Sequence, residues 1–144
     1  SMATRGMYIF ENFSPRNVYV HWDNDPEGAA AYFAEWLTKG LHETPETFCA
    51  LSEGKMEQDE HSHLDIEWRY RLMWPQLNPN KPYTVSDLPP NHLIIVLAQN
   101  RKVIGEKWTT EFCGPMFLFL EKFLDAKLHK YIDLICDEAH PKSH

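Results

Sequence analysis

The chain has 144 residues, of which 43% are hydrophobic, and a formal net charge of −7 at pH 7. This length and apolar content favour one domain with a single core, which we place at residues 3–140, while residues 1–2 resemble a cloning remnant. The acidity argues against direct binding of nucleic acid, because phosphate contacts need lysine and arginine. No apolar run approaches the ~20 residues that cross a bilayer, so we expect no membrane partner.

The chain is expected to begin with a hairpin that leads into a helix. Residues 7–11 and 18–22 are typical of short strands, and the residues between them have turn chemistry. A helix is expected over residues 26–39, where apolar side chains recur at helical spacing, and Gly40 is well placed to end it. A second, shorter helix is expected between Thr44 and Gly54.

The middle of the chain contains the clearest predicted strand. Residues 53–63 form a polar connector with little to bury, whereas residues 64–74 alternate apolar and charged side chains without a break. Residues 75–91 are rich in proline and are expected to form an irregular surface segment. Two further strands are expected, over residues 92–99 and 102–112.

The end of the chain predicts a long helix over residues 114–138, about 35 Å in length. Its far end could protrude and pair with a second copy, giving a homodimer. Strands and helices come in clusters instead of alternating strictly, which argues against a doubly wound parallel sheet. The predicted fold is therefore α+β: an antiparallel sheet of about five strands, helices packed on one face, and a long C-terminal helix.

The densest group of special residues lies between the second strand and the first helix: His21, Trp22, Asp23, Asn24 and Asp25. One interpretation is purely structural. Asp25 can cap the helix, Pro26 suits its first position, and Glu27 meets the positive end of the helix dipole. The other interpretation is a ligand-binding site, with these five side chains projecting from a strand end into a pocket.

A metal site is a further hypothesis. Histidines and carboxylates gather at His21 with Asp23 and at His61, His63 and Asp65, and imidazole with carboxylate suits zinc, iron or manganese. His63 and Asp65 also have the His-x-Asp spacing of an iron facial triad. Further histidines could supply its third ligand: His92, His129 or His140. That triad normally sits on a double-sheet barrel, which about five strands cannot build, so we expect no cofactor, with a divalent metal as the alternative.

The cysteines give a weak signal. Cys49, Cys113 and Cys136 are an odd, sparse set without zinc-ribbon spacing, which favours a reducing compartment such as the cytoplasm. Residues 113–115 resemble the start of a thioredoxin Cys-Gly-Pro-Cys motif without its second cysteine. A helix N-terminus there could activate the thiol, but we expect Cys113 to be buried and inert.

Two segments carry a resemblance to a family. Residues 4–5 are Thr-Arg, and residues 18–28 read Val-Tyr-Val-His-Trp-Asp-Asn-Asp-Pro-Glu-Gly. They resemble small proteins encoded by phages and prophages, whose signature is a Thr-Arg start and His-Trp-Asp-Gly-Tyr-Pro-Glu-Gly. The resemblance covers mainly residues 4–40, with a looser match at residues 65–70, and departs from the signature at Asn24 and Asp25. It implies an origin in a mobile element.

The leading functional hypothesis is a non-enzymatic phage or prophage accessory protein that binds a host protein in the host cytoplasm. A target with a basic surface would suit the net charge, and blocking a host defence, as anti-CRISPR proteins do, is the expected role. The alternative for the charge is that it only keeps the chain in solution. The alternative function is a small-ligand or metal-binding protein, including a metal-dependent hydrolase that uses the His/Asp residues.

Overall fold

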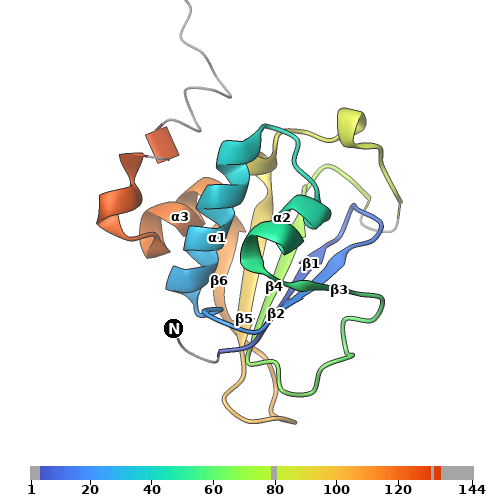
Figure 1. Cartoon of the computed structure of the whole chain (residues 1–144), viewed down its shortest axis with the longest axis vertical. Helices are drawn as coiled ribbons and strands as arrows, with labels where there is room; N and C mark the ends of the chain where they lie inside the picture. Colours follow the sequence, from blue (N-terminus) through green and yellow to red (C-terminus); the bar gives the residue numbers. More distant parts are fainter. Residues whose placement is uncertain (1–3, 79–80, 131, 134–144) are drawn as a thin grey trace, which may run out of the picture.

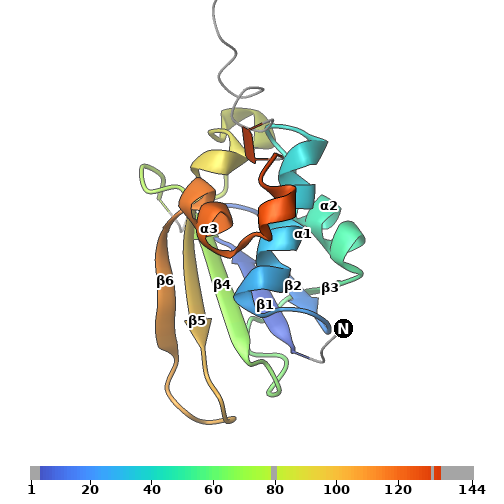
Figure 2. The same ribbon diagram turned by 90° about the vertical axis from the view of Figure 1, so that its left-hand side faces the viewer.

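The computed structural model describes residues 4–78, 81–130 and 132–133, which form an α+β fold (Figure 1). Within these residues one six-stranded sheet has the order β3-β2-β1-β4-β5-β6. Figure 2 shows the helices gathered on one face of this sheet. The strands are β1 (Gly6–Phe10), β2 (Asn17–Val20), β3 (Lys55–Glu57), β4 (Trp68–Met73), β5 (Ile95–Asn100) and β6 (Thr109–Pro115); the helices are α1 (Pro26–Lys39), α2 (Pro45–Ser52) and α3 (Met116–Phe123).

The predicted hairpin and first two helices are confirmed. β1 and β2 pair in antiparallel fashion, with Met7 opposite Tyr19. Asp25 caps α1 by accepting a hydrogen bond from the Gly28 N–H, and Thr44 caps α2 in the same way. Local capping chemistry and helical periodicity therefore place both helices correctly.

The sheet is mixed, so the prediction of an all-antiparallel sheet is wrong for one pair of strands. β1 and β4 run parallel, with Tyr8 beside Tyr70, while the other neighbouring pairs are antiparallel. Between β1 and β4 the chain forms β2, α1, α2 and β3, and this connection has the length that parallel pairing needs. The alternating pattern of β4 predicts which side chains face the core, but it does not predict whether the strand runs parallel or antiparallel to its neighbour.

Several predicted boundaries shift. The connector expected at residues 53–63 contains β3, a three-residue strand paired to β2. The strand expected from residue 64 begins at Trp68, because the chain turns before it: Leu64 is 72% exposed, and Ile66 is buried on the opposite face of the sheet. The last two strands start later than expected, and residues 102–108 lie in the loop between them.

The C-terminal helix is short, which corrects the prediction of a helix to residue 138. α3 ends at Phe123, since Leu124 is extended (φ −70°, ψ 136°) and its side chain is buried. Asp125 then caps a single 3₁₀ turn at Ala126–Leu128. The part of the prediction beyond residue 133 lies outside the described residues. The homodimer expected through the far end of this helix stays a prediction, because most of that end lies outside the described residues. No helix among the described residues is long and apolar enough to cross a membrane.

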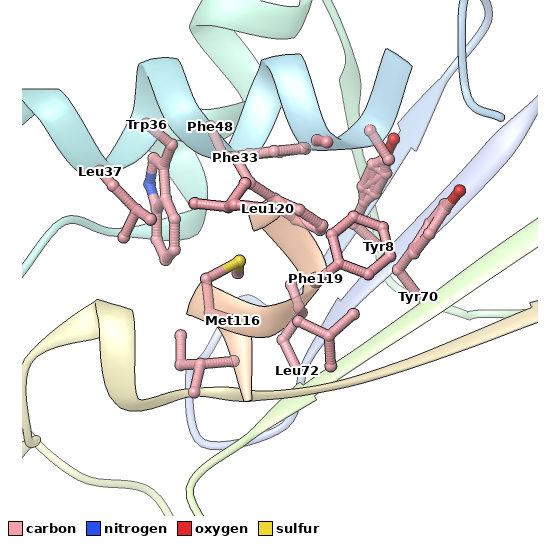
Figure 3. Close-up of a cluster of buried hydrophobic side chains, with 14 of the residues drawn as sticks. Tyr8, Phe33, Trp36, Leu37, Phe48, Tyr70, Leu72, Met116, Phe119 and Leu120 are labelled. Atoms are coloured by element: carbon pink, nitrogen blue, oxygen red, sulfur yellow. The ribbon is translucent and has the colours of Figure 1, made fainter. Parts of the chain in front are cut away.

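The core between the sheet and the helices is rich in aromatic rings (Figure 3). The Tyr8 ring lies 4.9 Å from Tyr70 and 4.6 Å from Phe48, and Phe33 lies 5.6 Å from Phe119. These rings come from β1, β4 and all three helices, so the core joins both layers. Burial on this scale supplies most of the driving force for folding.

Candidate functional site

The loop between β2 and α1 is held by one buried side chain. The Asn24 amide donates hydrogen bonds to the carbonyl oxygens of Thr4 (2.7 Å), Val20 (2.8 Å) and Trp22 (3.1 Å), and its Oδ1 accepts one from the Tyr8 hydroxyl (2.7 Å). Asn24 has no exposed surface. Its polar atoms are therefore used inside the protein, and we remove Asn24 from the candidate ligand-binding residues.

The same loop directs carboxylates outward. Asp23 has a left-handed backbone (φ 60°), which aspartate tolerates better than most residues, and Asp25 is partly exposed while capping α1. Glu27 follows in the first turn of the helix and is exposed. The structural interpretation of this segment thus holds for Asp25, and the loop also presents three acidic side chains on one side of α1.

These carboxylates line an open groove of about 750 Å³ between the start of α1 and the end of α3. Asp125 faces them from the other wall, together with Lys122, and Leu128 and Tyr32 supply apolar and aromatic lining. Four carboxylates and one lysine give the groove a negative potential. The pKa of the Tyr32 hydroxyl is raised by its burial and then by Asp23, Glu53 and Glu35, as expected beside negative charge.

Trp22 and His21 precede the acidic loop but do not line the groove. The Trp22 carbonyl accepts a hydrogen bond from the Tyr32 hydroxyl (2.8 Å), and its indole is 48% exposed. The imidazole of His21 lies 4.6 Å from the Trp22 ring. An exposed tryptophan is a common contact residue in protein–protein recognition, but this ring lies against His21 and not in the groove.

The histidines and aspartates proposed as metal ligands form separate pairs. His63 bonds Glu57 at 2.8 Å and stacks on the Tyr19 ring at 3.6 Å, whereas Asp65 pairs with Arg5 at 2.6 Å. His61 lies 3.4 Å from Glu60. Within the described residues no three His, Cys, Asp or Glu side chains are placed to hold a metal ion. The structure therefore does not bring the five predicted ligands together.

The remaining candidates are scattered. His92 is buried, and the ring of His129 lies 2.8 Å from the Leu124 carbonyl, while His140 and Cys136 lie outside the described residues. Cys113 is exposed, which corrects the expectation that it is buried, and it lies within β6 instead of at a helix start.

Sequence reasoning missed Asp125 and Lys122, which complete the groove opposite Asp23 and Glu27. They come from a segment that was expected to continue a long helix. The Leu-Asp pair at its end is a weak cap signal that could have suggested the break, because aspartate is favoured at such positions.

Comparisons with protein-family models, with curated proteins and with solved structures found no match.

Proposed function

We propose that this protein is a non-enzymatic accessory protein of a phage or prophage that binds a basic segment of a host protein in the host cytoplasm. The observation that carries the proposal is the groove beside α1, where the described residues of the lining include four carboxylates, Asp23, Asp25, Glu27 and Asp125, and one lysine, Lys122. The phage origin rests on the resemblance of residues 4–40. In this role the protein blocks a basic surface that its target needs, such as the nucleic-acid groove of a defence protein.

The shape and chemistry of the groove suit a protein ligand. It is open, with a volume of about 750 Å³, and its carboxylates would pair with lysine or arginine side chains of a protein segment. Tyr32 in the lining supplies an aromatic contact beside the charges, which matters because exposed ion pairs contribute little each. The net charge of −7 would speed the encounter with a basic target.

The test uses a fluorescent peptide of alternating lysine and arginine as the probe, titrated at low and high salt. We expect binding that weakens as salt screens the charges. The triple variant Asp23→Asn, Glu27→Gln, Asp125→Asn should bind about tenfold more weakly, because each exposed pair contributes up to about 1 kcal/mol. Asp25 is left intact because it caps α1.

A matched control removes the same number of charges elsewhere: Glu46→Gln, Glu106→Gln, Glu111→Gln, all exposed and outside the groove. This control should bind the peptide within about threefold of the original protein, because the three residues do not line the groove and salt screens exposed charges that are not in contact with the ligand. Equal losses in both triple variants would show that net charge alone drives binding, and the groove would be rejected as the site. A pull-down from host lysate with both variants then identifies the target.

A further inference from the structure

A second, smaller pocket lies on the face of the sheet that the helices leave bare. It has a volume of about 80 Å³ and is lined by residues of three segments, among them Arg69 of β4, Arg101 at the end of β5, His61, His63 and Trp108. The two loops that close it, before β4 and after β5, lie side by side at the foot of the sheet in Figure 1. The Arg101 guanidinium joins them by donating to the carbonyls of Ile66 (2.9 Å) and Leu64 (3.2 Å).

The two arginines of this pocket have no carboxylate partner among the described residues. The other arginines on this face do: Arg71 bonds Glu11 (2.6 Å) and Glu60 (2.7 Å), and Arg5 forms an ion pair with Asp65 (2.6 Å). Arg69 instead donates from Nε and Nη2 to the neutral Gln99 amide oxygen, at 2.9 and 2.6 Å. The pocket therefore contains two cations that form no ion pair with a carboxylate among the described residues.

The one acidic residue in the wall does not change this balance. Glu60 is bonded by Arg71 and lies 3.8 Å from Arg16, so its charge is already shared by two guanidinium groups. The pKa of Arg69 agrees with a local excess of positive charge: burial lowers it first, then the neighbouring Arg71, and Arg101 lowers it further, while Glu60 acts in the opposite direction. A bound anion would relieve this repulsion.

Trp108 fixes the two cations in place. The guanidinium carbons of Arg69 and Arg101 lie 4.4 and 4.5 Å from the centroid of its ring. Both arginines already donate from Nε and Nη2 to protein oxygens, which leaves their Nη1 groups to donate to a planar or tetrahedral oxyanion. Because the ring is covered by the guanidinium groups, it is not available to stack on a base.

We propose that this pocket binds a small oxyanion, a phosphate or carboxylate group, through the guanidinium groups of Arg69 and Arg101 in its lining. The volume of about 80 Å³ corresponds to two or three water molecules, which suits one such group and excludes a nucleotide. The pocket lies on the opposite side of the sheet from the groove beside α1. This proposal does not depend on the function proposed for that groove. The ligand is either a free anion or the same group carried on a peptide.

The experiment measures the melting temperature and then the dissociation constant, by calorimetry, for three probes: inorganic phosphate, acetate and N-acetyl-phosphoserine amide. Sodium chloride at matched ionic strength is the reference. We expect at least one probe to raise the melting temperature above the chloride reference. The tightest probe then shows whether the ligand is phosphate or carboxylate, and whether it is free or carried on a peptide.

Variants assign the binding to the pocket. Arg69→Gln and Arg101→Gln should each raise the dissociation constant of the tightest probe about tenfold or more, as expected for a lost charge-assisted hydrogen bond. Arg69→Lys and Arg101→Lys keep the charge and replace the corresponding glutamine variant in the test if that variant fails to fold. The control Lys102→Gln removes an exposed charge next to Arg101 and should leave binding unchanged. No stabilisation beyond chloride, or binding insensitive to both arginines, would overturn the proposal.

Discussion

At the scale of single residues, Asn24 decides how the β2–α1 loop is built. Its side-chain amide donates to three main-chain carbonyls and accepts a hydrogen bond from the Tyr8 hydroxyl. Its main-chain carbonyl accepts a hydrogen bond from the Tyr70 hydroxyl (2.7 Å). A buried polar group of this kind stabilises a unique structure only while its hydrogen bonds are intact. Asn24 therefore ties the start of the chain, two strands and the helix entry into one arrangement.

Replacing this residue should be costly. Asn24→Ala would remove the acceptor of the buried Tyr8 hydroxyl and one donor from each of three carbonyls, and we expect it to lower the free energy of unfolding by about 3 kcal/mol or more. Asp25→Ala removes only the helix cap and should cost about 1 kcal/mol. Urea denaturation of both variants measures the difference. If Asn24→Ala lowered the free energy of unfolding no more than Asp25→Ala, water would have to replace the amide. The structural role of the Asn24 side chain would then be minor.

At the scale of elements, α1 begins against the backbone of the preceding loop. A Cβ atom added at Gly28 would lie 1.9 Å from the Asp23 carbonyl oxygen. Asp23 itself has a left-handed backbone that turns the chain into the helix. The loop and the first helical turn can approach this closely only because residue 28 has no side chain.

This contact reverses the usual effect of a glycine-to-alanine change in a helix. Helix propensity alone would make Gly28→Ala stabilising by up to about 1 kcal/mol. We expect it instead to destabilise the protein by about 2 kcal/mol or more, because the backbone of the loop must move. The control Ala31→Gly, at an exposed position of the same helix, should cost about 1 kcal/mol from propensity alone. A stabilised Gly28→Ala variant would contradict this prediction and would mean that the loop backbone moves away from residue 28 at little cost in free energy.

At the scale of the whole molecule, the two faces of the sheet are held differently. The helices cover one face with an aromatic core, while the other face has a small apolar cluster, made of Met7, Ile9, Tyr19 and Ile66, surrounded by ion pairs. Arg71 connects Glu11, at the end of β1, to Glu60 in the β3–β4 connection. Segments far apart in the sequence are therefore joined by charge as well as by burial.

This network predicts a pH dependence of stability. Burial of Glu60 raises its pKa, but the hydrogen bond and charge of Arg71, with His61 and Arg16, outweigh it, so the pKa is lowered from its ordinary value of 4.5. A carboxyl whose pKa is lowered by folding stabilises the folded state above its ordinary pKa, and this contribution is lost as the pH falls through the lowered value. The free energy of unfolding should therefore decrease as the pH falls below about 4.5.

The free energy of unfolding of Glu60→Gln should decrease less over the same acidic range, because glutamine takes up no proton at this position. Chemical denaturation at several pH values between neutral and acidic compares it with the original protein and with Glu46→Gln, whose carboxylate is exposed. Parallel pH profiles for the original protein and Glu60→Gln would show that the Glu60 pairing contributes nothing to acid stability.

Much of the local structure could be predicted because its signals are local. The cap and proline at Asp25 and Pro26 define the start of α1, and the alternation around Tyr70 and Leu72 identifies β4 and its buried face. The break after Phe123 was missed because apolar periodicity continues across it, while the chain in fact turns at Leu124. Periodicity describes which side chains are buried, not whether the backbone between them stays helical.

The candidate sites were predictable only in part. Asp23 and Asp25 belong to the groove as expected, but Asp125, which faces them, lies a hundred residues away in the chain. The histidines that looked like metal ligands pair individually with Glu57 and Glu60. Composition shows which chemical groups are present, but their pairing depends on how the loops return to the sheet.

The sequence by itself determined the α+β class, the first hairpin, both capped helices and the acidic character, because each follows from short-range hydrogen bonding, periodicity or composition. The tertiary structure alone decided the parallel β1–β4 pairing, the short α3, and which charges meet in the two pockets. These features depend on contacts between distant segments, whose free energy is shared over the whole core. No single stretch of the chain contains that information.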